Sequence, residues 1–171
     1  FKKKYYFIIE SIKDIKLKNI KKSNKFNIIY RYKKKENLKD IKKFRQYCKI
    51  KKIQFYVAND LSLTRSIKAD GLYLSAHNTR LNVKFLANKK INIIGGAHNY
   101  KEINCKKMQG CSQILLSRIF KTSYKNKNSF LGIVKFNLLT KIINVGTTAL
   151  GGISFDNLNK VKNIQCNSIA M

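Results

Sequence analysis

Proline and tryptophan are absent from this chain of 171 residues, and acidic side chains are scarce. Only 8 residues are Asp or Glu, against 37 Lys or Arg, so the formal net charge is +29. Such an excess of positive charge is typical of proteins that bind nucleic acids or anionic membranes. The basic residues are spread along the chain, however, with 20 in residues 1–52 and 17 in residues 53–171. We therefore interpret most of the charge as solvated surface, and nucleic acid is not the favoured partner.

The sequence also lacks the patterns of a membrane or secreted protein. No stretch approaches the roughly 18 to 20 apolar residues that a membrane span needs, and no secretory signal pattern is present. The four cysteines form no C-x-x-C pair, and the two histidines do not lie near them at zinc-finger spacing. We expect a cytoplasmic protein with reduced thiols and no membrane partner.

What the sequence does contain is a series of short apolar runs, rich in β-branched and aromatic residues. Each run is nearly continuous rather than alternating, which is typical of a strand buried on both faces of a parallel sheet. Eight runs predict strands: Tyr5–Ile9, Asn27–Tyr30, Gln54–Ala58, Gly71–Leu74, Ile91–Ile94, Gln113–Leu116, Ile142–Val145 with Thr148–Leu150, and Ser168–Met171.

Lysine-rich segments separate these runs, and four of them predict helices: Leu38–Lys51, Asp60–Lys68, Tyr100–Gln109 and Asp156–Lys162. Strands that alternate with helices predict a parallel α/β fold. Eight strands allow a closed (β/α)8 barrel, or TIM barrel, which would be compact because about 250 residues are typical of that fold. We expect a single barrel domain over residues 1–171, incomplete at both ends and with its last helix truncated.

Two glycine pairs lie near the ends of predicted strands, at Gly95-Gly96 and Gly151-Gly152. Glycine lets the backbone approach a ligand closely and present its N–H groups to an anion. The carboxyl ends of the strands carry the site in a barrel of this kind. Simple tight turns are the alternative interpretation of both pairs.

Five segments, in this order, resemble the thiamine phosphate synthase family, which has the thiazole tautomerase as a relative. They are Phe55–Asp60, Ala69–Leu74, Ile94–Asn99, Leu116–Thr122 and Leu150–Ile153, and the resemblance extends from Tyr6 to Met171. It implies a (β/α)8 barrel transferase of thiamine biosynthesis. Such an enzyme couples a hydroxymethylpyrimidine diphosphate to a thiazole phosphate and releases diphosphate with the help of Mg²⁺. Phosphorylated pyrimidine and thiazole molecules are therefore the implied partners.

The resemblance also implies roles for individual residues. Arg31 and Lys33 match the family's R-x-K after the second strand, and Lys125 matches the Lys of its T-x-T-K motif. These three would grip the diphosphate as catalytic residues, while Thr122 and the backbone of Gly152 would hold the thiazole phosphate. The complete implied substrate-binding set is Arg31, Lys33, Asn59, Gly96, Thr122, Tyr124, Lys125 and Gly152.

The chain departs from the family where the metal is held. The family uses two aspartates, which align with Asn59 and Asn78, and a shift of one residue in the first alignment brings in Asp60. The implied Mg²⁺ ligands are thus Asn59, Asp60 and Asn78, although Mg²⁺ prefers carboxylates to neutral amides. The tautomerase histidine aligns with Arg118, which cannot shuttle a proton as imidazole does.

Three functional hypotheses follow, in this order. The first is an active thiamine phosphate synthase-like transferase with a degenerate metal site. The second is a family paralogue that binds a phosphorylated thiazole or pyrimidine without coupling them. The third is a basic nucleic-acid-binding protein, although the sequence contains no recognisable binding module. The oligomeric state stays open.

Overall fold

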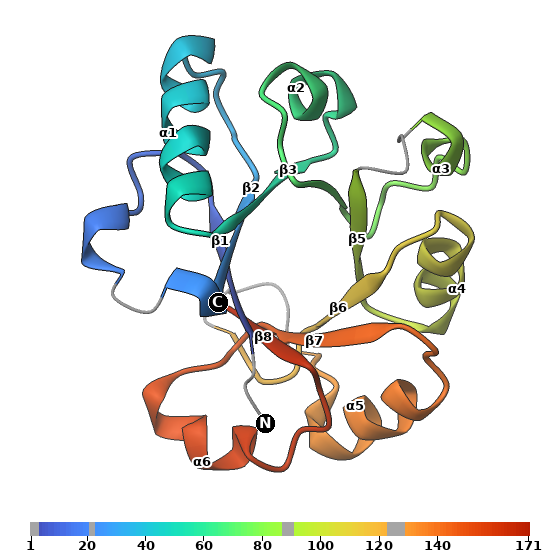
Figure 1. Cartoon of the computed structure of the whole chain (residues 1–171). Helices are drawn as coiled ribbons and strands as arrows, with labels where there is room; N and C mark the ends of the chain where they lie inside the picture. Colours follow the sequence, from blue (N-terminus) through green and yellow to red (C-terminus); the bar gives the residue numbers. More distant parts are fainter. Residues whose placement is uncertain (1–3, 21–22, 87–90, 123–128) are drawn as a thin grey trace.

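The computed structural model describes residues 4–20, 23–86, 91–122 and 129–171. Within these ranges, eight parallel strands form a closed barrel, and helices cover its outside (Figure 1). The strands are neighbours in chain order, and β8 pairs with β1 to close the ring. This arrangement confirms the predicted (β/α)8 barrel.

The strands coincide closely with the predicted apolar runs, except for the fifth, which extends three residues beyond the predicted end at Ile94, and the seventh. Their bounds are β1 Lys4–Ile9, β2 Phe26–Tyr30, β3 Gln54–Ala58, β4 Gly71–Leu74, β5 Asn92–Ala97, β6 Gln113–Ser117, β7 Gly146–Leu150 and β8 Ser168–Ala170. The prediction that the seventh strand begins at Ile142 is wrong, because Ile142 caps the preceding helix. Ile143 belongs to the same buried cluster as Phe136 of that helix. Ile143 therefore packs between the helix and the barrel instead of forming part of a strand.

The helices are α1 Leu38–Ile50, α2 Leu61–Ser66, α3 Val83–Leu86, α4 Tyr100–Met108, α5 Gly132–Lys141 and α6 Leu158–Val161, with the 3₁₀ helices η1 Leu17–Asn19, η2 Ser23–Lys25 and η3 Phe155–Asn157. Four of them lie within the predicted helical segments, whereas α3 and α5 were not predicted. Among the helices described, none is both long and apolar enough to cross a membrane.

Side chains of alternate strand positions fill the inside of the barrel. Tyr6, Ile29, Tyr56, Ile94 and Leu115 belong to one buried cluster there. The hydroxyl of Tyr6 donates to Oε1 of Gln113 at 2.7 Å, so the large tyrosine keeps a hydrogen-bond partner in the interior. The barrel is therefore packed rather than hollow, and it gives the loops at its carboxyl end a rigid base.

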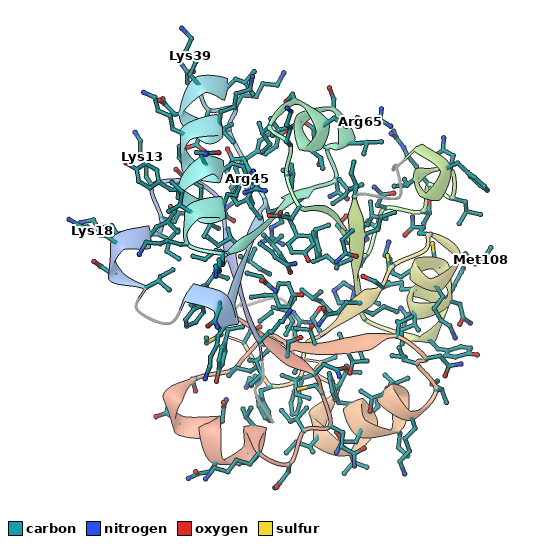
Figure 2. The ribbon with its side chains drawn as sticks, in the orientation of Figure 1. Lys13, Lys18, Lys39, Arg45, Arg65 and Met108 are labelled. Carbon is teal, nitrogen blue, oxygen red and sulfur yellow. The ribbon has the colours of Figure 1, made fainter. Side chains whose placement is uncertain are left out.

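Much of the positive charge lies on the outside of the barrel. Figure 2 shows Lys18 of η1 and Lys39 of α1 pointing away from the strands. Arg45 of α1 is different, because it is only 8% exposed and its Nη2 lies 2.8 Å from Oδ1 of Asp70. The outward lysines agree with the interpretation of the charge as solvated surface.

Candidate functional site

An open cavity of about 980 Å³ lies at the carboxyl ends of the strands. Its lining comes from the ends of β1, β2, β5, β6, β7 and β8 and from the residues that follow them. This is the end at which barrels of this fold carry their active sites. The cavity is therefore the candidate site.

Arg31 and Lys33 line this cavity just after β2, where the resemblance places them. Both face a carboxylate that the sequence reasoning did not identify. Nζ of Lys33 lies 2.7 Å from Oε2 of Glu10, and Nη2 of Arg31 lies 3.9 Å from Oε1 of the same side chain. Glu10 directly follows β1, and this position at a strand end is the signal that could have revealed it.

Thr122 and Gly152 line the same cavity from the β6 and β7 sides. The backbone of Gly152 has φ +73°, and a Cβ there would lie 2.5 Å from the backbone oxygen of Phe120. Only glycine therefore allows the loops after β6 and β7 to approach so closely. Oγ1 of Thr122 is buried and has no hydrogen-bond partner among the described residues. An oxygen of a ligand in the cavity would satisfy this hydroxyl.

Arg118, at the position of the tautomerase histidine, also lines the cavity. Its Nη2 donates to the backbone oxygen of Ser129 at 3.2 Å, and its Nε is buried without a partner in the described part of the chain. Sequence reasoning treated Arg118 only as the loss of a proton-transfer group. The structure instead shows a guanidinium at the site with one donor, Nε, that has no partner among the described residues.

The two glycine pairs differ in role. Gly151 and Gly152 line the cavity. A Cβ at Gly95 would lie 2.6 Å from Cδ of Lys106, and one at Gly96 would lie 2.5 Å from the hydroxyl of Tyr73. Gly95 and Gly96 therefore make room for two buried side chains. Gly96 does not line the cavity, whereas a substrate-binding residue would be expected to do so.

Asn59, Asp60 and Asn78 line a separate recess of about 580 Å³ rather than the cavity. Asp60 caps helix α2, because its Oδ1 accepts the backbone N–H of Leu63 at 2.8 Å. Its Oδ2 accepts the hydroxyl of Tyr32, also at 2.8 Å. Both carboxylate oxygens of Asp60 are thus engaged in structural hydrogen bonds.

The amides of Asn59 and Asn78 bind each other. Oδ1 of Asn59 accepts from Nδ2 of Asn78 at 3.2 Å and from the backbone N–H of Ser75 at 3.0 Å. In the described ranges, no group of three or more His, Cys, Asp and Glu residues could hold a metal ion. Mg²⁺ prefers hard, anionic oxygen ligands. The residues at the predicted metal site therefore do not fit Mg²⁺.

Lys106 is a fully buried lysine that holds the loop containing Asn78. Its Nζ donates to the backbone oxygen of Asn78 at 2.6 Å and to Oε1 of Gln109 at 2.9 Å. Burial lowers the pKa of Lys106 from its ordinary value of 10.5, because desolvation disfavours the charged form. This lysine has a structural role outside the cavity.

His98 follows β5 and also lines the cavity. Its backbone N–H donates to Oε2 of Glu102 at 2.7 Å, and its ring Nδ1 lies 2.9 Å from the same oxygen. Burial acts to raise the pKa of Glu102, but these hydrogen bonds and the charge of His98 outweigh it and lower that pKa. Glu102 thus orients His98 at the rim.

Two predicted site residues, Tyr124 and Lys125, lie outside the described residues.

In sequence, the chain is similar to proteins described as thiamine-phosphate synthases. The sequence pattern of the family described as thiamine monophosphate synthase matches residues 9–171 of this chain. A thiamine-phosphate synthase of Prochlorococcus marinus subsp. pastoris is 32% identical over 140 residues, which are 80% of this chain and 39% of that protein. Another, from Fusobacterium nucleatum, is 26% identical over 123 residues, which are 71% of this chain and 60% of that protein. The match thus spans less than two thirds of either relative.

Solved structures share the fold. The thiamine phosphate pyrophosphorylase of Pyrococcus furiosus superposes over 99% of this chain and 85% of its own, with a TM-score of 0.80 and 19% identity. The YdjI aldolase of Escherichia coli K12 covers 99% of this chain with a TM-score of 0.67 and 8% identity. At these identities the structural similarity shows the barrel alone. The family pattern matches nearly the whole sequence, and the chain therefore belongs to the thiamine monophosphate synthase family.

Proposed function

We propose that this chain is a transferase of the thiamine phosphate synthase type, which couples a hydroxymethylpyrimidine diphosphate to a thiazole phosphate. One observation carries the proposal. Arg31 and Lys33 after β2, and Thr122 after β6, line one cavity. Because β2 and β6 are four strands apart in a closed ring of eight, these groups lie across the mouth from each other. Two anion-binding positions suit two substrates that each carry a phosphate.

The reaction needs little covalent chemistry from the protein. The C–O bond between the pyrimidine methylene carbon and the diphosphate breaks, and the diphosphate leaves with the electron pair. The thiazole nitrogen then donates its lone pair to that carbon and forms the new C–N bond, without a proton transfer. The protein must therefore stabilise the leaving anion and protect the pyrimidine cation from water.

The cavity contains groups suited to both tasks. The guanidinium of Arg31 and the ammonium of Lys33 would stabilise the negative charge of the leaving diphosphate. Thr122 and the Gly152 backbone would hold the thiazole phosphate. Leu150 and Ile153 contribute apolar side chains to the lining, which would disfavour water next to the cation. No side chain is required to act as a base.

The experiment is to mix the full chain with both substrates and to follow thiamine phosphate by chromatography, once with Mg²⁺ and once with EDTA. We expect product only when both substrates are present. Binding of one substrate without product in either condition would overturn the transferase proposal in favour of a non-coupling paralogue. A Lys49→Gln variant is the matched control, because Lys49 is exposed in the last turn of α1, at the other end of the barrel.

A further inference from the structure

Arg118 lines the cavity without an ion-pair partner among the described residues. The other two basic side chains named above, Arg31 and Lys33, both face Glu10. The second carboxylate in the lining belongs to Asp14, whose Oδ2 already accepts two backbone N–H groups, at 2.8 and 2.9 Å. The positive charge of Arg118 is therefore available to a ligand.

The position of the Arg118 side chain is fixed by its neighbours. Nη2 donates to the backbone oxygen of Ser129 at 3.2 Å, which holds one end of the guanidinium. A Cβ at Gly151 would lie 2.9 Å from Cγ of Arg118, so the glycine lets the side chain lie against the loop after β7. The guanidinium is thus held in place before any ligand binds, and little conformational entropy is lost on binding.

Two buried donors of this part of the lining are unpaired within the described chain. They are Nε of Arg118 and Oγ1 of Thr122. Buried polar atoms in folded proteins nearly always have a hydrogen-bond partner, and oxygens of a ligand in this cavity could serve as partners for both donors. A guanidinium and a hydroxyl together suit phosphate oxygens, because the N–H groups of arginine match their geometry.

The recess that contains the predicted metal ligands is unfavourable for a divalent cation. Asn59 and Asn78 offer neutral amides that are already bonded to each other. The amine of Lys106 donates to the backbone oxygen of Asn78 at 2.6 Å, so this oxygen is engaged as well. Within the cavity, the side chains of Arg31, Lys33 and Arg118 offer positive charge to a phosphate-bearing ligand.

We infer that Arg118 binds phosphate oxygens in this cavity and that this binding needs no divalent cation. The inference rests on the proposed function, because it says how the same cavity holds its phosphate-bearing ligand. It adds a binding residue that the resemblance does not supply. It also removes a requirement for Mg²⁺ that the resemblance implies.

The test is calorimetric titration of the full chain with inorganic phosphate, which represents the phosphate group held on the Thr122 side of the cavity, in EDTA and in Mg²⁺. We expect the wild type to bind in EDTA, with no tighter binding when Mg²⁺ is added. Arg118→Gln should weaken binding about tenfold or more in both conditions, whereas Lys49→Gln, which removes the same charge elsewhere, should change the Kd less than about twofold. Arg118→Lys keeps the charge but loses the paired donors, so its Kd should lie between the other two.

Two results would overturn the inference: binding that requires Mg²⁺, or equal affinities of the wild type and both Arg118 variants. Circular dichroism identifies a variant that fails to fold, and Arg118→Lys then serves as the test in place of Arg118→Gln. The titration requires no coupling reaction. A chain that binds inorganic phosphate through Arg118 but forms no thiamine phosphate would refute the proposed function and leave this inference standing.

Discussion

Replacing Gly152 with alanine should destabilise the protein far more than the same change at Gly132, although both glycines have a left-handed backbone. Their φ angles are +73° and +71°. At Gly152 the new Cβ would lie 2.5 Å from the backbone oxygen of Phe120 and 2.6 Å from that of Lys121. At Gly132 no atom lies within 4 Å of the new Cβ. The pair therefore separates backbone strain from crowding between the loops after β6 and β7.

The two contributions have different sizes. A left-handed backbone costs an L-residue about 1 kcal/mol or slightly more, so Gly132→Ala should lower the free energy of unfolding by about 1 kcal/mol. Overpacking adds about 1–3 kcal/mol, and here the contacts are with backbone atoms that cannot rotate away. Gly152→Ala should therefore lower the free energy of unfolding by about 3 kcal/mol.

Urea unfolding of both variants and the wild type, followed by circular dichroism, measures this difference. We expect the free energies of unfolding of the two variants to differ by about 2 kcal/mol, with Gly152→Ala the less stable. Values that agree within about 0.5 kcal/mol would refute the close approach of the two loops. The Gly152→Ala variant should also bind inorganic phosphate more weakly, because separating the loops moves Thr122 away from the cavity.

Three further predictions test the cavity, the amide pair and a buried thiol. Glu10→Gln removes the carboxylate that competes with diphosphate for Lys33. Calorimetry should therefore show that diphosphate binds about threefold tighter or more. Unchanged or weaker binding would show that Glu10 and diphosphate do not compete. The double variant Asn59→Asp/Asn78→Asp brings two carboxylates together, so Mg²⁺ should raise its Tm but not that of the wild type. Equal shifts in Tm would contradict the conclusion that the neutral amides make the recess unsuitable for Mg²⁺. Burial raises the pKa of Cys48 from 9.0 to about 12. The thiol therefore stabilises the fold below pH 9, and this contribution falls by about 1.4 kcal/mol per pH unit as the pH rises from 9 towards 12. In urea unfolding, the free energy of unfolding of Cys48→Ala should fall less steeply between pH 9 and pH 12 than that of the wild type. An equally steep fall would contradict the raised pKa of the buried thiol.

The strands could be predicted from the sequence because a parallel barrel buries both faces of each strand. The runs Gln54–Ala58 and Gly71–Leu74 coincide with β3 and β4 without error. Helix α5 was missed because apolar residues occur on more than one of its sides. Phe136 is fully buried in the core, yet Val134 is 75% exposed, so no clear stripe marks the helix.

The site was partly predictable, for a similar reason. Arg31 and Lys33 follow a strand directly, and strand ends meet at the rim of a barrel whatever the loops do. Asp60 was ambiguous, because a carboxylate after a strand can cap a helix or bind a metal, and only the tertiary structure shows that it caps α2. The pairing of Glu10 with Lys33 joins two strands and leaves no local pattern.

The most direct test of the proposed reaction is the ratio of its two products. The full chain, supplied with both substrates, should release diphosphate and thiamine phosphate in equal amounts. Arg31→Gln combined with Lys33→Gln should slow both by the same large factor, and Lys49→Gln should leave the rate unchanged. Failure to form thiamine phosphate, or a rate indifferent to the loss of Arg31 and Lys33, would contradict the assignment of this cavity as the site of coupling.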